Sequence, residues 1–95
     1  MSSHAFRYEF TPDVPLEEVE SSLLLSILGV ESLHGETEVH LNASHVIDAH
    51  QRTCLIDVGT DVGRDLNRLF AGFIRREFGR SQFSVQRVDS LDAAR

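Results

Sequence analysis

Short segments of alternating apolar and polar residues are interleaved with longer segments of helical periodicity, and this order restricts the fold more than any other feature of the chain. Near the N-terminus, Phe6, Tyr8 and Phe10 alternate with polar residues, which predicts a half-buried strand. Farther along, apolar residues recur every three or four positions, which predicts amphipathic helices. We expect a strand at about 4–11, a helix at about 14–34, a hairpin of two strands at about 37–58, a helix at about 61–78 and a strand at about 82–88.

Both predicted helices have start and stop signals. Asp13 is suited to cap the first helix, and Gly35 follows as a natural left-handed stop. Thr60 or Asp61 is placed to cap the second helix, which ends before Gly79. The expected inward stripes are Leu16, Val19, Leu23, Ile27 and Val30 in the first helix, and Val62, Leu66, Leu69, Phe70, Phe73 and Ile74 in the second.

The predicted hairpin joins EVHLNASHVID to RTCLIDVG through the short polar segment AHQ. In its first strand, Val39 and Leu41 are expected to point inward, while His40 and Asn42 point to the open face of the sheet. A change of phase near Val46 suggests a β-bulge. A helix anywhere within 39–47 or 53–58 would contradict this assignment. The other residues expected to point inward are Cys54, Ile56, Val58, Phe83 and Val85.

Two β-α-β units that share such a hairpin predict a ferredoxin-like β-α-β-β-α-β sandwich. This α+β fold has a four-stranded antiparallel sheet with two helices on one face. The strand order expected for it is 4-1-3-2, with the first and third strands central, where we expect them to run parallel to each other. Ninety-five residues fit one such domain, placed at 1–88, and we expect 89–95 to form a frayed tail. The fold alone implies no activity, because it hosts many unrelated functions.

Charge and composition exclude several classes of protein. The net charge of -6 disfavours binding to a phosphate backbone. RNA-recognition domains of this topology carry stacking aromatics on the central strands, where this chain has Arg7, Glu9, Leu55 and Asp57. The N-terminus lacks the pattern of a signal peptide, and no apolar run approaches the ~20 residues of a membrane span. We therefore expect a cytoplasmic protein without a nucleic-acid or membrane partner. The single cysteine, Cys54, lies in an apolar run and is expected to be a buried thiol.

The open face of the predicted sheet carries the candidate ligand-binding residues. Arg7, Glu9 and Asp57 are placed there on the central strands, and His40 on a neighbouring strand. One interpretation is a cross-strand ion-pair network. The alternative is a binding or catalytic site for a small ligand, in which Arg7 grips an anionic group and Glu9, His40 or Asp57 acts as acid or base.

His40, His45 and His50 recur every five residues, but this spacing does not favour a metal site. Histidines five residues apart in a strand are separated by roughly 16 Å and point to opposite faces of the sheet. Zinc ligands must all lie about 2 Å from the same ion. We therefore predict no metal shared by the three histidines, and no cofactor. His45 and His50, with Asp48, remain a weak alternative at the hairpin end. The chain has no nucleophile elbow and no HExxH or CxxC motif, so it offers no catalytic residue by motif.

The predicted first helix has more leucine than one buried face requires. Leu25 falls opposite the inward stripe, and Leu24 and Leu28 fill the flank between. Surplus leucines of this kind favour a second apolar contact. We therefore expect a homo-oligomer or another protein partner, with Leu24, Leu25 and Leu28 in the interface. The function that fits is a small, non-catalytic, oligomerising interaction module, and the open sheet face is the rival interface.

Overall fold

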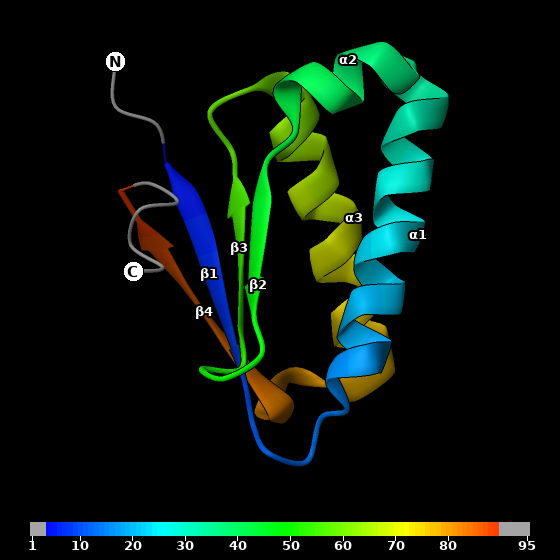
Figure 1. Ribbon diagram of the computed structural model, residues 1–95. Coiled ribbons are helices and arrows are strands. Elements are labelled where there is room, and N and C mark those ends of the chain that lie inside the picture. The colour runs from blue at the N-terminus through cyan, green and yellow to red at the C-terminus, as the bar shows by residue number, and fades with distance from the viewer. Residues whose placement is uncertain (1–3, 90–95) are drawn as a thin grey trace.

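Four strands form one antiparallel sheet in the order β2-β3-β1-β4, and three helices cover one of its faces (Figure 1). This architecture comes from a computed structural model, which describes residues 4–89. The elements are β1 (Ala5–Phe10), α1 (Leu16–His34), α2 (Glu36–Asn42), β2 (His45–Asp48), β3 (Thr53–Asp57), α3 (Asp61–Phe78), a 3-10 turn (Arg80–Gln82) and β4 (Phe83–Val88).

The two central strands are β1 and β3, and read from the other edge the order is β4-β1-β3-β2. The expectation that the central pair is parallel is wrong, because all three strand pairings are antiparallel. The short connection between β2 and β3 reverses the chain, so β3 runs against both of its neighbours. The expected tail at 89–95 lies outside the described residues, except for Asp89.

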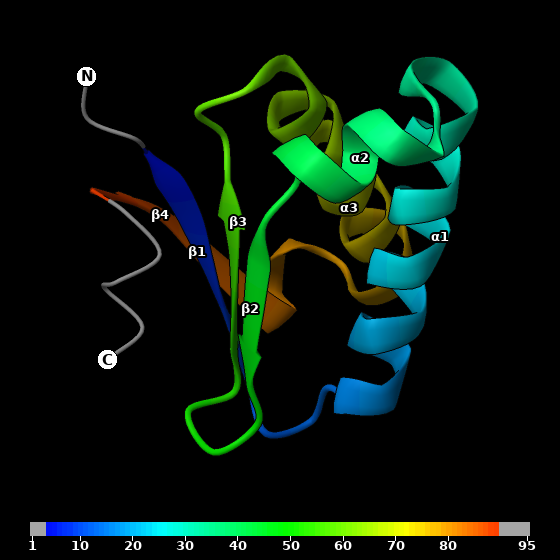
Figure 2. The same cartoon turned by 45° about the horizontal axis from the view of Figure 1, so that its top comes forward.

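The segment before β2 is helical, which contradicts the long strand predicted there. α2 includes residues 39–42, and β2 begins only at His45. Glu36 and Glu38 lie in the first turn of α2, where acidic side chains suit the positive end of the helix dipole. Val39 is buried, but Leu41, which a strand would turn to the same side, is exposed. Figure 2 shows α2 leading from the end of α1 towards β2, in front of the start of α3.

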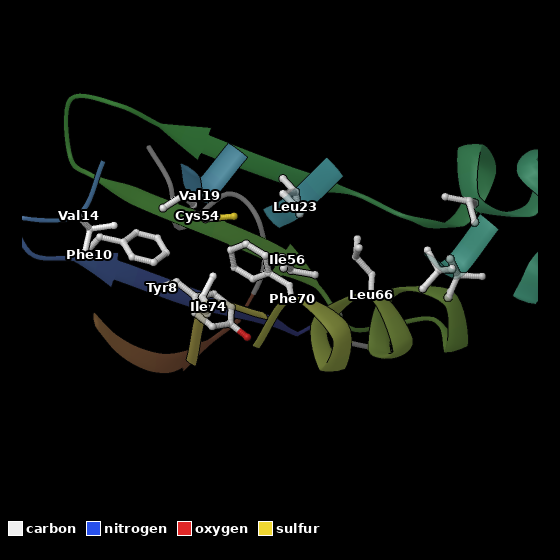
Figure 3. Close-up of a cluster of buried hydrophobic side chains, with 13 residues drawn as sticks. Tyr8, Phe10, Val14, Val19, Leu23, Cys54, Ile56, Leu66, Phe70 and Ile74 are labelled. Atoms are coloured by element: carbon white, nitrogen blue, oxygen red, sulfur yellow. The ribbon is translucent and has the colours of Figure 1, made fainter. Parts of the chain in front are cut away.

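The hydrophobic core lies between the sheet and the two long helices (Figure 3). Tyr8 of β1 meets Phe70 of α3 edge to face, with ring centroids 5.0 Å apart. Val85, expected to point inward, is 45% exposed because β4 is an edge strand. The other buried members are Phe10, Cys54 and Ile56 from the sheet, Val14 before α1, Val19, Leu23 and Val30 from α1, Val39 from α2, and Val62, Leu66 and Ile74 from α3.

Candidate functional site on the outer face of the helical layer

Three leucines of α1 point away from the core. Leu24, Leu25 and Leu28 are 61%, 57% and 58% exposed, and we call them the leucine stripe. Six large apolar side chains are exposed among residues 4–89, and five of them belong to α1 or α2. Exposed apolar surface therefore gathers on the helical layer. The sequence-based prediction that these leucines lie outside the core is confirmed.

The inner face of α1 is made partly of small residues, because α1 packs closely on α3. Ser22 and Ser26 are buried there, and a Cβ at Gly29 would lie 2.8 Å from Cδ1 of Leu69. Larger side chains at such positions would force the helices apart. The Ser26 hydroxyl donates a hydrogen bond to the carbonyl oxygen of Ser22 at 2.8 Å, so its burial leaves no polar group unpaired. The inner face is thus complete without the leucine stripe.

Acidic residues border the leucine stripe at both ends. At about 100° per residue, Glu17, Glu20 and Glu31 share the outer side of α1 with the leucines. The helix contains no arginine or lysine. His34, its last residue, is directed to Asp65 of α3, with Nε2 and Oδ2 2.7 Å apart. The outer side of α1 therefore has an apolar centre and acidic margins.

A hollow of about 640 Å³ adjoins this surface, between α1, α2 and the start of β2. Ile27 of α1 lines it together with Val39 and Leu41 of α2. Leu41 is 71% exposed, so it extends the apolar surface from α1 on to α2. The insertion of α2 therefore enlarges the exposed apolar area of the helical layer.

The three histidines of the hairpin region lie on three different elements. His40 is on α2, His45 begins β2, and His50 is in the turn that follows. The placement of His40 on the open sheet face is wrong, because its backbone is helical; it lines the hollow beside α1, as His45 does. Burial lowers the pKa of His45, which favours its neutral form at pH 7. Within residues 4–89, no three His, Cys, Asp or Glu side chains come together as a metal site would require.

The other candidate ligand-binding residues lie on the sheet face away from the helices, but they have different partners. Arg7 and Glu9 form an ion pair along β1 at 3.6 Å. Asp57 accepts a hydrogen bond from the backbone N–H of Gly59 at 2.7 Å, which shapes the turn into α3. The prediction that the central strands are open on this face is wrong at Leu55, the cross-strand neighbour of Arg7, because this side chain is buried. Arg7 and Glu9 thus pair within one strand rather than across strands, and the Asp57 carboxylate binds the backbone.

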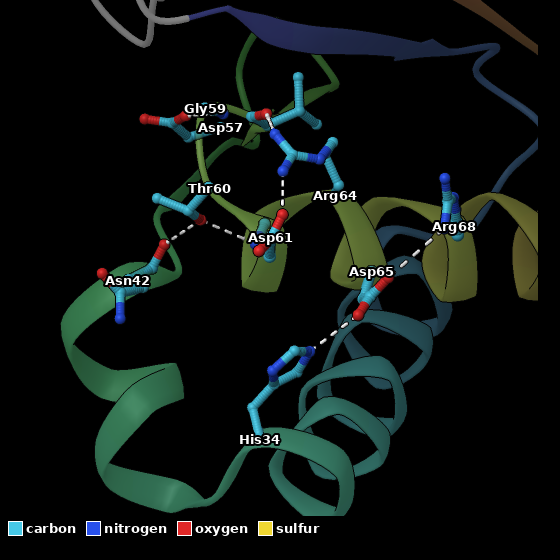
Figure 4. A network of polar contacts seen from close by, with 11 residues as sticks. His34, Asn42, Asp57, Gly59, Thr60, Asp61, Arg64, Asp65 and Arg68 are labelled. Carbon is cyan, nitrogen blue, oxygen red and sulfur yellow. Dashed lines mark hydrogen bonds and ion pairs between the residues drawn. The ribbon is translucent and has the colours of Figure 1, made fainter.

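A polar network joins the three helices at the end of the molecule where α2 lies (Figure 4). Thr60 accepts a hydrogen bond from the N–H of Gly63 and donates one to the carbonyl oxygen of Asn42, at 3.0 and 2.8 Å. Asp65 lies between His34 and Arg68, 2.7 Å from the first and 3.6 Å from the second. Thr60 was recognisable as a cap, but no spacing rule reveals a contact such as that of His34 with Asp65, which lie 31 residues apart.

No protein-family model matches this chain, and neither a curated protein nor a solved structure was found that matches it. Of the helices in the described part of the chain, none has the length and apolar character needed to cross a membrane.

Proposed function

We propose that this chain is a small, non-catalytic interaction module that forms a homodimer through the leucine stripe of α1. The observation that carries the proposal is that Leu24, Leu25 and Leu28 are more than half exposed on a helix whose inner face is already packed. Removing apolar surface from water is the main favourable contribution to most protein association. A self-complementary patch is most commonly satisfied by a closed two-fold dimer.

The position of the stripe supports a second copy as the partner. Leu24 and Leu28 are centred on Ser26, close to the middle of the helix Leu16–His34. A two-fold axis that crosses α1 at Ser26 places Leu24 of one copy opposite Leu28 of the second copy, and Leu28 opposite Leu24. Two antiparallel helices then overlap along nearly their whole length of about 28 Å. A stripe near one end of α1 would not give such an overlap.

The acidic margins support the antiparallel arrangement over the parallel one. With the axis at Ser26, Glu20 lies opposite Ser32 of the second copy, and Glu31 lies opposite Ser21. In a parallel pair each glutamate would instead face the same glutamate of the second copy, and like charges at that distance repel. Stable interfaces bury about 800 Å² on each partner, so neighbouring exposed residues such as Leu41 are expected to contribute.

The ferredoxin-like assignment belongs to the same proposal. It is supported by the alternation of strands and helices and by the central position of β1 and β3. The chain departs from the predicted plan in α2, which is added between α1 and β2. In this account α2 is an addition to the helical layer that extends the interaction surface.

Light scattering coupled to size-exclusion chromatography tests the proposal. The wild type is expected at twice the chain mass of 10.7 kDa. The double variant Leu25→Glu/Leu28→Glu is expected at the chain mass, because each copy would bury two unpaired carboxylates in the interface. Circular dichroism of the double variant should show an unchanged fold, because both side chains are exposed in the monomer. Arg7→Ala, on the sheet face away from the helices, is the matched control and should stay dimeric.

Two outcomes would refute the proposed function. A monomeric wild type at high concentration would remove self-association. A dimer that persists in Leu25→Glu/Leu28→Glu but dissociates in Arg7→Ala would move the interface to the sheet face away from the helices.

A further inference from the structure

Three arginines line one hollow on the far side of α3 from α1, and we infer that this hollow binds a small organic anion. Its volume is about 380 Å³, within the range of roughly 300–1,000 Å³ that is typical of small-molecule sites. Arg64 and Arg68 come from α3 and Arg87 from β4. No residue of α1 lines it, so a dimer formed through the leucine stripe leaves the hollow open.

The charge of this hollow contrasts with that of the whole chain. The net charge is -6, with 15 acidic residues, yet none of the described residues that line the hollow is acidic. All nine cationic residues of the chain are arginines, and one third of them meet here. Like charges gathered in one place repel, and a bound anion would relieve the repulsion.

The ion pairs nearby leave the hollow positive. Asp61 pairs with Arg64, and Asp65 pairs with Arg68 at 3.6 Å. Asp65 is shared with His34, and neither aspartate lines the hollow. Arg87 forms no ion pair with any of the described residues. Each guanidinium has five N–H donors, so paired arginines keep donors for a ligand.

A hydrogen bond positions Arg64, and the sheet register sets the side on which Arg87 lies. Arg64 Nη1 donates to the carbonyl oxygen of Val58 at 3.3 Å, which ties it to the wall of the hollow. Phe6 of β1 lies directly opposite Arg87 in the sheet register, so both side chains leave the sheet on the helix-covered side. Figure 4 shows Arg64 and Arg68 following each other along α3, on the side that faces the sheet.

Asn67 adds a neutral donor to the same hollow. The Tyr8 hydroxyl donates to Oδ1 of Asn67 at 2.5 Å, which fixes the orientation of the side-chain amide. Because its oxygen is taken, Asn67 offers the N–H groups of Nδ2 to a ligand. Phe6 and Val58 supply the apolar part of the lining. The combination selects a carboxylate or phosphate attached to an apolar group, since guanidinium groups bind such oxyanions in bidentate fashion.

Isothermal titration calorimetry of the full-length protein with phenyl phosphate tests the inference. Saturable binding at one site per chain is expected, at least tenfold weaker in Arg87→Gln and in Arg64→Gln. Arg75→Gln is the matched control, because Arg75 is an exposed arginine of α3 outside the hollow, and it should bind as the wild type does. Inorganic phosphate should bind more weakly than phenyl phosphate because it lacks the apolar group. Phenol should also bind more weakly, because it lacks the anionic group. Raising the salt concentration should weaken binding.

The side-chain amide of Asn67 gives an independent reading by NMR, where phenyl phosphate should shift its resonances. No saturable binding at millimolar phenyl phosphate would overturn the inference. Equal weakening of binding by Arg75→Gln and Arg87→Gln would also overturn it, because the affinity would then depend only on the net charge of the protein. Equal affinity for inorganic phosphate would overturn the apolar part of the assignment. None of these results depends on whether the chain dimerises.

Discussion

Alkaline pH is expected to destabilise the fold through the thiol of Cys54. This side chain lies on β3 in the core and is completely buried. Burial raises the pKa of Cys54 from its ordinary value of 9.0 to about 12. Above pH 9 the thiol loses its proton in the unfolded chain but keeps it in the folded one. The contribution of this thiol to the free energy of unfolding is therefore constant well below pH 9 and falls as the pH rises from about 9 to about 12.

The size of the effect at pH 10 follows from this difference. Ionisation of the unfolded thiol lowers the free energy of unfolding by about 1.4 kcal/mol at that pH. The chain has no lysine, and arginine stays protonated, so Tyr8 is the only other side chain that titrates in this range. Burial, and to a lesser extent Cys54, raise the pKa of Tyr8 above its ordinary value of 10.0, which adds about 0.4 kcal/mol of the same sign.

Urea unfolding at about pH 7 and pH 10, followed by circular dichroism, measures the effect. The free energy of unfolding of the wild type should fall by about 2 kcal/mol between the two conditions. Cys54→Ala is less stable at both pH values because it leaves a cavity, but its decrease should be only about 0.4 kcal/mol. An equal decrease in both proteins would refute the reasoning, because the titrating group would then lie elsewhere.

Two further predictions concern the start and the middle of α3. Gly63→Ala should lower the free energy of unfolding by about 3 kcal/mol or more, because its Cβ would lie 2.1 Å from the carbonyl oxygen of Asp57. Gly72→Ala is the matched control, because no atom lies within 4 Å of the new Cβ. It should raise the free energy of unfolding by about 1 kcal/mol in the same thermal or urea assay. Thr60→Ala should cost about 1–2 kcal/mol, since it removes the helix cap and the bond to Asn42, while Thr60→Ser should retain most of the stability. A tolerated Gly63→Ala, or Thr60→Ser as unstable as Thr60→Ala, would contradict these assignments.

Periodicity predicted the long elements well because each of them buries one face, and the residues on that face are therefore apolar. Alternation in β1 correctly indicated Tyr8 and Phe10 as core residues, and the stripe of α3 correctly included Leu66 and Phe70. These segments are long enough for period 2 and period 3.6 to differ clearly. The stop at Gly35 was also visible, and the structure has this glycine at φ 88° between α1 and α2.

The error at α2 arose where the two periods are hard to tell apart. Over the five residues 39–43, Val39 and Ala43 fit one face of a helix, while Val39, Leu41 and Ala43 fit one face of a strand, and the two patterns differ only in the burial of Leu41. Two local signals favoured the helix: the acidic first turn, and Glu38 four residues before Asn42, whose Nδ2 donates to Oε2 of Glu38 at 2.9 Å. The same error displaced His40 from the candidate site, because a face can be assigned only once the element is known.

The hollow lined by arginines could not be predicted from spacing. Arg64 and Arg68 are one helical turn apart, but Arg87 joins them only through the pairing of β4 with β1. The leucine stripe, by contrast, lies on one helix, so the sequence alone was enough to place it outside the core. Local patterns were sufficient for surfaces on a single element and insufficient for sites shared between elements.

Disulfide trapping tests the antiparallel homodimer most directly. Cys54 is buried, so one cysteine added on α1 provides the reactive thiol. Leu25 and Ser32 are both exposed and lie seven residues apart on the same side of the helix. With the axis at Ser26, the two copies of residue 25 are offset by about 3 Å along the helix, and the two copies of residue 32 by about 18 Å. Under mild oxidation Leu25→Cys should form a covalent dimer rapidly and Ser32→Cys should not, since a disulfide requires Cα atoms within about 7 Å. Equal trapping of both variants would indicate a parallel pair, and trapping of neither, in a protein that is dimeric in solution, would contradict the α1 interface.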